Sequence, residues 1–437
     1  GYDIDNSAVF SGANGIQFNP SSDGNRKTWT VSLWLKRSEL STETTIFGSQ
    51  NTVMVLMDPD WFRFSLYTGS ATYYFDTENG GPVYRDTSAW YNFVFQCDTT
   101  QGTAADRAKL WVNGESVTNT NSNTIPQNAE FDLNDNTKNI QVGYFYAGNE
   151  QLDGYLSEIH FTDGVANDPT EFGEYDNDSG IWKPKAYAGS YGTNGFYLEF
   201  KESAASATGI GKDTSGNGHN FSTGGTYPSQ ATDTPTNNFA TQNVIWGTDR
   251  MPLMSEGATE IGNNVNAYRY STSTIGVANG KWYWEIKPTV NGNTLVSGAG
   301  IASNQTTLFF YDETGNFVYH YDGDRYVNGA GVSSYGAAWS TNDIIGFAYD
   351  ADNWTLTCYV NNSSQGNLLA GQTDISSELF IPYIYSFGTH TYQTNFGGYT
   401  TMSNTHTNTD ENGYGSFVYA PPSGYYALCT KNLAEFG

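Results

Sequence analysis

The chain has 437 residues, 16% of them aromatic, and carries 48 glycines. Aromatic residues suit pleated, half-buried strands and glycine suits turns, so the composition favours an all-β protein. Forty-five acidic residues against nineteen basic ones give a net charge of −26. Such a surface repels phosphate backbones and anionic lipid, which argues against nucleic acid or a membrane as a partner. The length exceeds what one hydrophobic core usually serves, so two domains are expected.

Residues 1–200 contain the first group of predicted strands. In residues 28–36 the apolar side chains Trp29, Val31, Leu33 and Leu35 alternate with other residues, which predicts a strand with one buried face. Turn signals such as Asn113-Gly114 separate further candidate strands. These strands cover residues 52–57, 61–67, 90–97, 109–112, 140–144 and 155–161. Many short strands at this spacing indicate a β-sandwich.

The order of these motifs resembles that of the laminin-G/concanavalin A-like jelly roll. The segments that carry the resemblance are residues 29–36, 88–94, 108–115 and 152–159. The third runs from a strand into an Asn-Gly turn, and the fourth is similar to the last strand of these lectin-like domains. The resemblance implies a jelly-roll fold for the first domain.

A change of composition follows this first domain. Residues 195–200 predict a strand, residues 212–221 a hairpin, and residues 223–238 are rich in Gly, Thr, Ser, Asn and Pro. The last composition is typical of an extended linker. We therefore expect a first domain at residues 1–200, a hairpin and linker at residues 201–240, and a second domain at residues 241–437.

The second domain has its own ordered set of motifs. They begin with Gly-Lys-Trp-Tyr-Trp-Glu-Ile at residues 280–286 and continue through residues 297–302, 335–350, 355–362, 395–397 and 421–425. Their order resembles the signature of the SPRY family. The resemblance implies a second antiparallel sandwich that acts as a binding module. The predicted fold class is thus all-β, with two tandem antiparallel β-sandwiches.

Catalytic chemistry has little support in the sequence. Glycoside hydrolysis needs paired carboxylates, yet no strand carries a Glu-x-Asp-x-x-Glu run, and Asp322 and Asp324 lie in a glycine-containing loop. The five histidines have no zinc-ligand spacing. We therefore predict no catalytic residue and no enzyme activity.

Calcium is the cofactor that the laminin-G resemblance implies. Jelly-roll lectins hold Ca²⁺ at the rim of the sandwich with carboxylates and carbonyl oxygens. The residues predicted to bind it are Asp58, Asp60, Glu150 and Asp153. The alternative is that these residues serve only as turn formers.

Aromatic loops are the binding surface that the SPRY resemblance implies. Tyrosine offers rigid contact area with a polar tip, which suits sugars and proteins. The predicted ligand-binding residues are Tyr311, Tyr319, His320, Tyr321, Asp322, Arg325, Tyr326 and Trp339. Core packing would account for some of these rings instead.

Four further segments resemble virion appendage proteins of tailed bacteriophages, particularly marine ones. They are residues 181–187, 190–198, 233–239 and 424–433. The resemblance implies a tail or capsid protein on the virion surface that binds host-surface glycan, a host receptor or a neighbouring virion protein. The alternatives are a glycan-degrading depolymerase and a bacterial extracellular adhesin or lectin. The sequence leaves open whether the chain forms a homo-oligomer.

Overall fold

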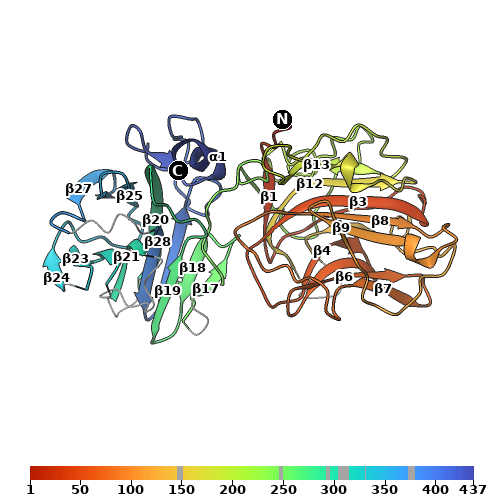
Figure 1. The fold of residues 1–437 in the computed structure, drawn as a ribbon, viewed down its shortest axis with the longest axis horizontal. Helices are drawn as coiled ribbons and strands as arrows, with labels where there is room; N and C mark the ends of the chain where they lie inside the picture. Colours follow the sequence, from red (N-terminus) through yellow and green to blue (C-terminus); the bar gives the residue numbers. More distant parts are fainter. Residues whose placement is uncertain (145–150, 246–249, 292–295, 304–313, 330, 373–378) are drawn as a thin grey trace. The chain divides into compact units, whose positions relative to one another are not determined.

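The computed structural model describes residues 1–144, 151–245, 250–291, 296–303, 314–329, 331–372 and 379–437. The chain forms two compact units, Gly1–Thr236 and Asn237–Gly437. Each unit consists mainly of two antiparallel sheets (Figure 1). The prediction of two tandem antiparallel β-sandwiches is therefore confirmed. In the described part of the chain, no helix is long and apolar enough to cross a membrane.

The first sandwich pairs an eight-stranded sheet with a six-stranded one. The eight-stranded sheet has the order β10 (Glu115–Val117), β9 (Ala108–Val112), β8 (Tyr91–Asp98), β3 (Thr28–Arg37), β12 (Asp153–Asp163), β1 (Ser7–Ser11) and β16 (Ser229–Ala231), and β15 (Phe196–Leu198) also pairs with β12. The six-stranded sheet has the order β2 (Ile16–Phe18), β11 (Ile140–Val142), β4 (Thr44–Ser49), β5 (Thr52–Met57), β6 (Trp61–Tyr67) and β7 (Thr72–Asp76). Two short elements, η1 (Ala104–Asp106) and η2 (Pro169–Glu171), are 3₁₀ helices.

Strand β3 shows how the apolar alternation builds the core. Trp29, Val31, Leu33 and Leu35 all have no exposed surface and belong to the core between the two sheets, as predicted. The opposite face of β3 is also buried, however, from residue 29 to the end of the strand. The alternation predicted that this second face would be exposed to solvent. Because it is buried instead, other parts of the chain must cover it.

The chain after β12 provides that cover, including much of the predicted linker. The hairpin of β13 (Gly173–Tyr175) and β14 (Trp182–Pro184) contacts β8. The indole nitrogen of Trp182 donates to the side chain of Asn92 on β8 at 3.0 Å. Strand β16 then pairs with β1. The chain leaves the unit at Thr236, whose hydroxyl accepts from the amide of Ile4 at 2.9 Å and donates to its carbonyl at 3.0 Å. Residues 201–236 thus belong to the first sandwich, which differs from the predicted boundaries.

A buried ion pair fixes this returning segment to the sheet. The Lys36 ammonium lies 2.6 Å from a carboxylate oxygen of Asp233, and the two side chains are 0% and 1% exposed. Trp90 donates to the same carboxylate at 3.1 Å, and Ser7 donates to the Asp233 carbonyl at 2.6 Å. Burial lowers the pKa of Lys36, and the charge of Asp233 opposes that shift.

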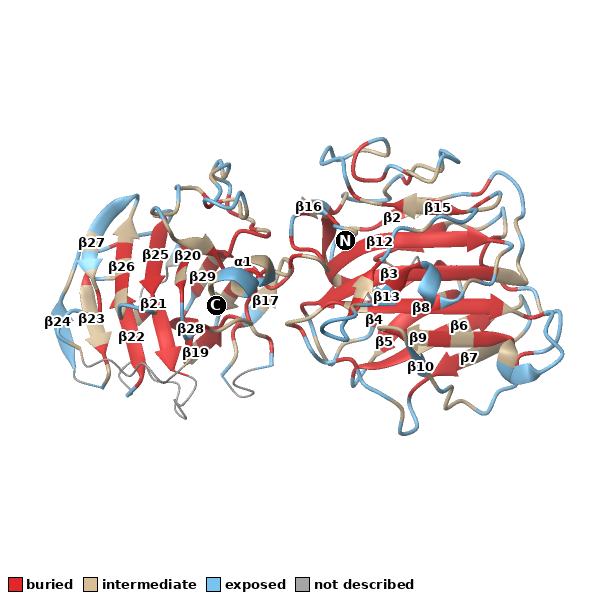
Figure 2. Ribbon diagram, turned by 45° about the horizontal axis from the view of Figure 1, so that its top comes forward, coloured by how far each residue is buried: buried red, intermediate tan, exposed pale blue. Residues whose placement is uncertain are grey.

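The second sandwich is also built from eight-stranded and six-stranded sheets. The eight-stranded sheet has the order β17 (Leu253–Ser255), β18 (Glu260–Asn263), β29 (His390–Asn395), β20 (Lys281–Asn291), β25 (Ile345–Asp350), β26 (Thr355–Val360) and β27 (Ser363–Asn367), and β30 (Tyr426–Ala427) pairs in parallel with β20. The six-stranded sheet has the order β19 (Tyr268–Thr272), β28 (Phe380–Phe387), β21 (Val296–Ser303), β22 (Asn316–His320), β23 (Asp324–Val327) and β24 (Val332–Ser334). The edge strands β24 and β27 are the most exposed of these, as Figure 2 shows.

Strand β20 contains the first predicted SPRY-like motif and anchors the end of the chain. Trp282, Trp284 and Ile286 point into the core. Between them, the fully buried Glu285 accepts four hydrogen bonds, from Tyr283, Asn395 and the amides of residues 418 and 419. The chain then forms a short helix, α1 (Thr430–Phe436), which the sequence did not predict.

The Lys36–Asp233 pair supports a stability prediction. Asp233→Ala removes the carboxylate that pairs with a buried ammonium, and breaking a buried pair in this way typically costs about 3–5 kcal/mol. We expect a fall of that size in the free energy of unfolding of the first sandwich, measured by urea denaturation. The double variant Lys36→Met/Asp233→Leu removes both charges and should recover most of the loss. An unchanged stability in Asp233→Ala would contradict the anchoring role.

Glu285 supports a second stability prediction. Glu285→Gln replaces an acceptor oxygen with an amide donor that faces N–H groups, and each group left unsatisfied costs about 1–3 kcal/mol. We expect the melting temperature of the second sandwich to fall. Glu260→Gln on β18 is the matched control, because this carboxylate is only half buried and accepts from the Gln393 amide at 3.2 Å. Equal effects of the two substitutions would contradict the anchoring role of Glu285.

Candidate functional site

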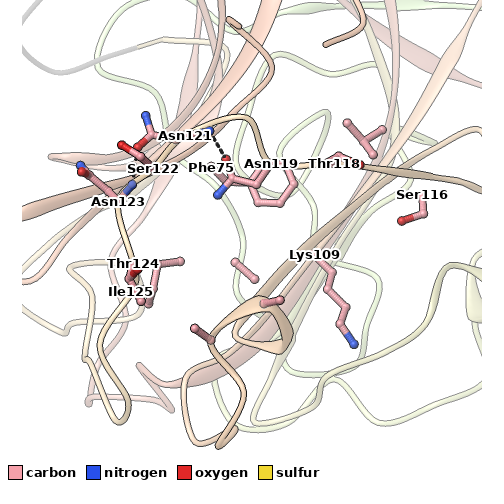
Figure 3. Close-up of a pocket in the computed structure, with 14 residues that line it drawn as sticks. Phe75, Lys109, Ser116, Thr118, Asn119, Asn121, Ser122, Asn123, Thr124 and Ile125 are labelled. Carbon is pink, nitrogen blue, oxygen red and sulfur yellow. Dashed lines mark hydrogen bonds between the residues drawn. The ribbon is translucent and has the colours of Figure 1, made fainter. Parts of the chain in front are cut away.

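A groove of about 440 Å³ lies on the first sandwich, where an edge of each sheet contributes to it. Strand β7 is the edge of the six-stranded sheet and β10 is the edge of the eight-stranded sheet. We call this cavity the edge groove. Figure 3 shows its walls, with Asn121, Ser122 and Asn123 on one side and Ser116 and Lys109 on the other.

The floor of the edge groove is apolar and its walls are polar. Phe75 and Ile125 belong to the hydrophobic core and are 2% and 5% exposed. The small side chains of Ala104 and Ala105 leave the space above η1 open. The exposed polar groups are those of Ser116, Thr118, Ser122, Asn123 and Thr124.

One buried carboxylate holds the polar wall in place. Asp76, at the end of β7, accepts from the Asn121 amide at 2.9 Å, the Thr120 hydroxyl at 3.2 Å and the Arg63 guanidinium at 3.2 Å. The side chain of Asn119 accepts from the backbone amides of Asp76 and Asn121, both at 3.0 Å. The wall is therefore attached to the free edge of β7 largely through side chains, which fixes its position without a regular strand.

The groove offers mainly uncharged hydrogen-bonding groups. Its one lysine, Lys109, is 3.0 Å from Asp106, and both side chains are about two-fifths exposed, so the pair contributes little energy. Amide and hydroxyl groups can both donate and accept. Such groups above a small apolar floor suit a polyhydroxylated ligand, whose hydroxyls need both kinds of partner.

Two of the four carboxylates predicted to bind calcium have other partners. Asp60 is fully buried between Arg37, at 2.8 Å, and Arg85, at 3.1 Å. Asp153 accepts from the Ser38 hydroxyl at 2.7 Å. Asp58 is exposed, and Glu150 lies outside the described residues. Among the residues that the structure describes, no three His, Cys, Asp or Glu side chains are placed to hold a metal ion.

Two arginines therefore balance the negative charge of Asp60, where the sequence predicted a calcium ion. Burial and then the charge of Asp153 raise the pKa of the neighbouring Glu39. The predicted role of Asp60 is thus corrected to a structural one, since this carboxylate is paired with two arginines and has no exposed surface at which an ion could enter.

The predicted aromatic site of the second sandwich divides into core and surface. Tyr319 and Trp339 are 0% and 2% exposed and belong to the hydrophobic core, where the Tyr319 hydroxyl donates to the Ala337 carbonyl. These two rings therefore offer no contact surface, which corrects their predicted role. Arg325 donates to the carbonyls of Leu368 at 2.7 Å and Ala370 at 3.1 Å, so it positions the chain after β27.

The remaining predicted residues do come together. The His320 ring lies 4.6 Å from that of Tyr321 and 5.1 Å from that of Tyr326, measured between ring centroids. Its Nδ1 lies 2.7 Å from Asp322. Burial raises the pKa of Asp322, but the hydrogen bonds from His320 and from the amide of Asp324, together with the charge of His320, outweigh it and the net shift is downward. Tyr311 lies outside the described residues.

Sequence reasoning missed the edge groove. Its wall comes from residues 118–124, a run of Thr, Asn and Ser with no glycine or proline. Such a run is usually interpreted as a surface loop, because Asn and Ser favour turns. The available signal was that seven consecutive polar residues without glycine or proline are suited to an extended wall.

Comparison with known families identifies the first domain. Residues 10–170 match a laminin G family described as the concanavalin A-like lectin/glucanases superfamily. The first sandwich is a concanavalin A-like/laminin G domain. No curated protein matches the chain in sequence.

Several solved structures are similar to part of this chain. The SPRY domain of human HERC1 is 14% identical, with a TM-score of 0.28 over 31% of this chain and 87% of that one. A Bacteroides ovatus protein to which carbohydrate binding is ascribed is 18% identical, with a TM-score of 0.37 over 52% of this chain and 60% of that one. A heptameric SAP-like pentraxin from Limulus polyphemus is 16% identical, with a TM-score of 0.27 over 38% of this chain and 80% of that one.

The attachment of the groove wall can be tested at Asp76. Asp76→Ala removes the acceptor shared by Thr120 and Asn121, so we expect faster hydrogen–deuterium exchange across residues 119–123. The variant should also lose about 1–3 kcal/mol of stability, as for other buried groups left unsatisfied. Asp106→Ala, on the opposite side of the groove, is the control and should leave exchange in the wall unchanged. Wild-type exchange in Asp76→Ala would show that other contacts hold the wall.

Proposed function

We propose that the protein is a non-enzymatic adhesion protein whose concanavalin A-like domain binds carbohydrate in the edge groove. The observation that carries this proposal is a 440 Å³ groove lined by neutral amide and hydroxyl groups, in a domain that matches a lectin and glucanase superfamily. The carbohydrate binding ascribed to the Bacteroides ovatus protein is in keeping with this ligand class.

We further propose that the chain is a tail or capsid appendage of a tailed bacteriophage, located on the virion surface. Support comes from the four segments that resemble such appendages, at residues 181–187, 190–198, 233–239 and 424–433. The ligand would then be a host-surface glycan. The cluster that Tyr321, Asp322 and Tyr326 form around the buried His320 would supply a second contact, to the host receptor or to a neighbouring virion protein.

A glycan array probed with the whole chain, with and without EDTA, tests the carbohydrate proposal. We expect binding that persists in EDTA, because the edge groove relies on amide and hydroxyl groups rather than on a bound metal. Binding that EDTA abolishes would instead favour a calcium site near Glu39 and Asp153. Shortening of the bound glycan would favour the depolymerase alternative.

A bulky substitution tests whether glycan binds in the edge groove. Ala105→Trp fills the groove from the exposed element η1, so we expect the affinity to fall at least roughly tenfold, which corresponds to about 1.4 kcal/mol. Ala205→Trp is the matched control, because Ala205 is an exposed alanine of the same unit that does not line the groove. Unchanged glycan binding by Ala105→Trp would move the site elsewhere, and an absence of glycan binding by the wild type would contradict the proposal.

A further inference from the structure

An exposed Asn-Gly pair lies in the turn that follows β7, beside the wall of the edge groove. Asn79 and Gly80 are both exposed, and the backbone amide of Asn79 donates to the Thr120 hydroxyl of that wall at 3.2 Å. In an Asn-Gly pair the side-chain amide is open to attack by the following backbone nitrogen, because glycine has no Cβ to obstruct the approach. This turn therefore combines a reactive dipeptide with a structural contact to the groove wall.

Eight other Asn-Gly pairs occur in the sequence, and the structure restrains the described ones. The side chains of six of these asparagines take part in hydrogen bonds, namely Asn14, Asn113, Asn194, Asn217, Asn328 and Asn412. In Asn279-Gly280 the glycine nitrogen is occupied instead, because it donates to Asp352 at 3.0 Å. The remaining pair, Asn291-Gly292, extends outside the described residues.

The pair Asn217-Gly218 shows how such a restraint protects an asparagine. Both residues are exposed, as Asn79 and Gly80 are. The side-chain amide of Asn217, however, donates to the carbonyls of Gly192 and Gly195, both at 2.8 Å. The glycine nitrogen can reach the side-chain carbon only if the side chain rotates and breaks both hydrogen bonds. Exposure alone therefore does not make an Asn-Gly pair reactive.

Asn79 lacks these restraints. In the described part of the chain, no group forms a hydrogen bond with its side chain. The amide of Gly80 donates at 3.2 Å to the Glu78 carbonyl inside the same turn, which is a long bond between neighbouring residues. Gly80 has a φ of 80°, and no atom lies within 4 Å of the position that a Cβ would take. The Asn79 side chain is therefore able to rotate toward the nitrogen of Gly80.

We propose that Asn79 is a site of spontaneous deamidation, with the backbone nitrogen of Gly80 as the nucleophile and water as the second reactant. The nitrogen loses its proton to hydroxide and bonds to the side-chain Cγ of Asn79, and Nδ2 takes up a proton and leaves as ammonia. Water then opens the resulting succinimide ring at either carbonyl, which gives aspartate or isoaspartate. The net reaction converts an amide and water into a carboxylic acid and ammonia.

The product of this reaction weakens the attachment of the groove wall. Isoaspartate adds a methylene group to the backbone, which displaces the turn and disturbs the hydrogen bond between Asn79 and Thr120. The new carboxylate also stands next to Glu78, which already shares the Arg63 guanidinium with Asp76, at 3.4 and 3.2 Å. Since like charges repel, a further carboxylate disfavours the compact turn. Deamidation therefore acts on the edge groove through residues that support its wall.

Peptide mapping by mass spectrometry, after incubation of the whole folded chain at mildly alkaline pH, tests the reaction. We expect Asn79 to convert at least roughly tenfold faster than Asn217, which corresponds to about 1.4 kcal/mol in the activation barrier. Asn217 is the internal control, because it belongs to an exposed Asn-Gly pair with a restrained side chain. Conversion should slow at mildly acidic pH, because the Gly80 nitrogen must lose its proton. Equal rates at Asn79 and Asn217 would overturn the proposal.

Hydrogen–deuterium exchange of the incubated protein tests the effect on the wall. We expect faster exchange across residues 119–123 in the incubated wild type but not in incubated Asn79→Gln, because glutamine keeps the amide and must close a larger, slower-forming ring. Asn217→Gln is the matched control and should change with incubation as the wild type does. Unchanged exchange in wild-type protein that is fully deamidated at Asn79 would overturn the proposed effect. No ligand enters either measurement, so both outcomes are independent of glycan binding.

Discussion

The first sandwich depends on covering the second face of its eight-stranded sheet. A sheet packed on only one side leaves its outer residues in water, yet β3 is buried on both faces from residue 29 onward. The cover is the chain that follows β12, and the ion pair between Lys36 and Asp233 holds its far end. A buried ion pair contributes modest net stability, but it penalises any arrangement that separates the two charges. This interaction therefore specifies where the returning chain lies.

Much of the fold was predictable from local patterns. The alternation around Trp29 and Leu33 placed a core strand correctly, because strongly apolar residues at every second position indicate a β-strand with that face in the core. The returning segment of residues 201–236 was not predictable as part of the first domain. Its Gly-, Thr- and Ser-rich composition resembles that of a flexible linker, and its order comes from tertiary contacts such as those of Asp233.

The candidate sites show the same division between local and tertiary information. The sequence correctly marked the region of His320, Tyr321 and Tyr326 as rich in aromatic groups, but burial separates Tyr319 and Trp339 from them. Residue type also suggested a metal-binding role for Asp60, whereas the folded chain brings two arginines to it. Tyr2 and Tyr197 are 195 positions apart in the sequence, yet their hydroxyl oxygens lie 3.1 Å apart. No local motif could have indicated this contact, since the topology alone brings Tyr2 to Tyr197.

The hydrogen bonds between Ile4 and Thr236 have a consequence for how this domain can be reused. They join the two ends of the first unit, so the chain enters and leaves the sandwich at one place. A unit with adjoining ends can be inserted into a surface loop of another protein, or circularly permuted, with little disturbance of its host or its own core. The domain therefore has the geometry of an exchangeable module, whose insertion into another chain would require compatible sequence only at two adjoining junctions.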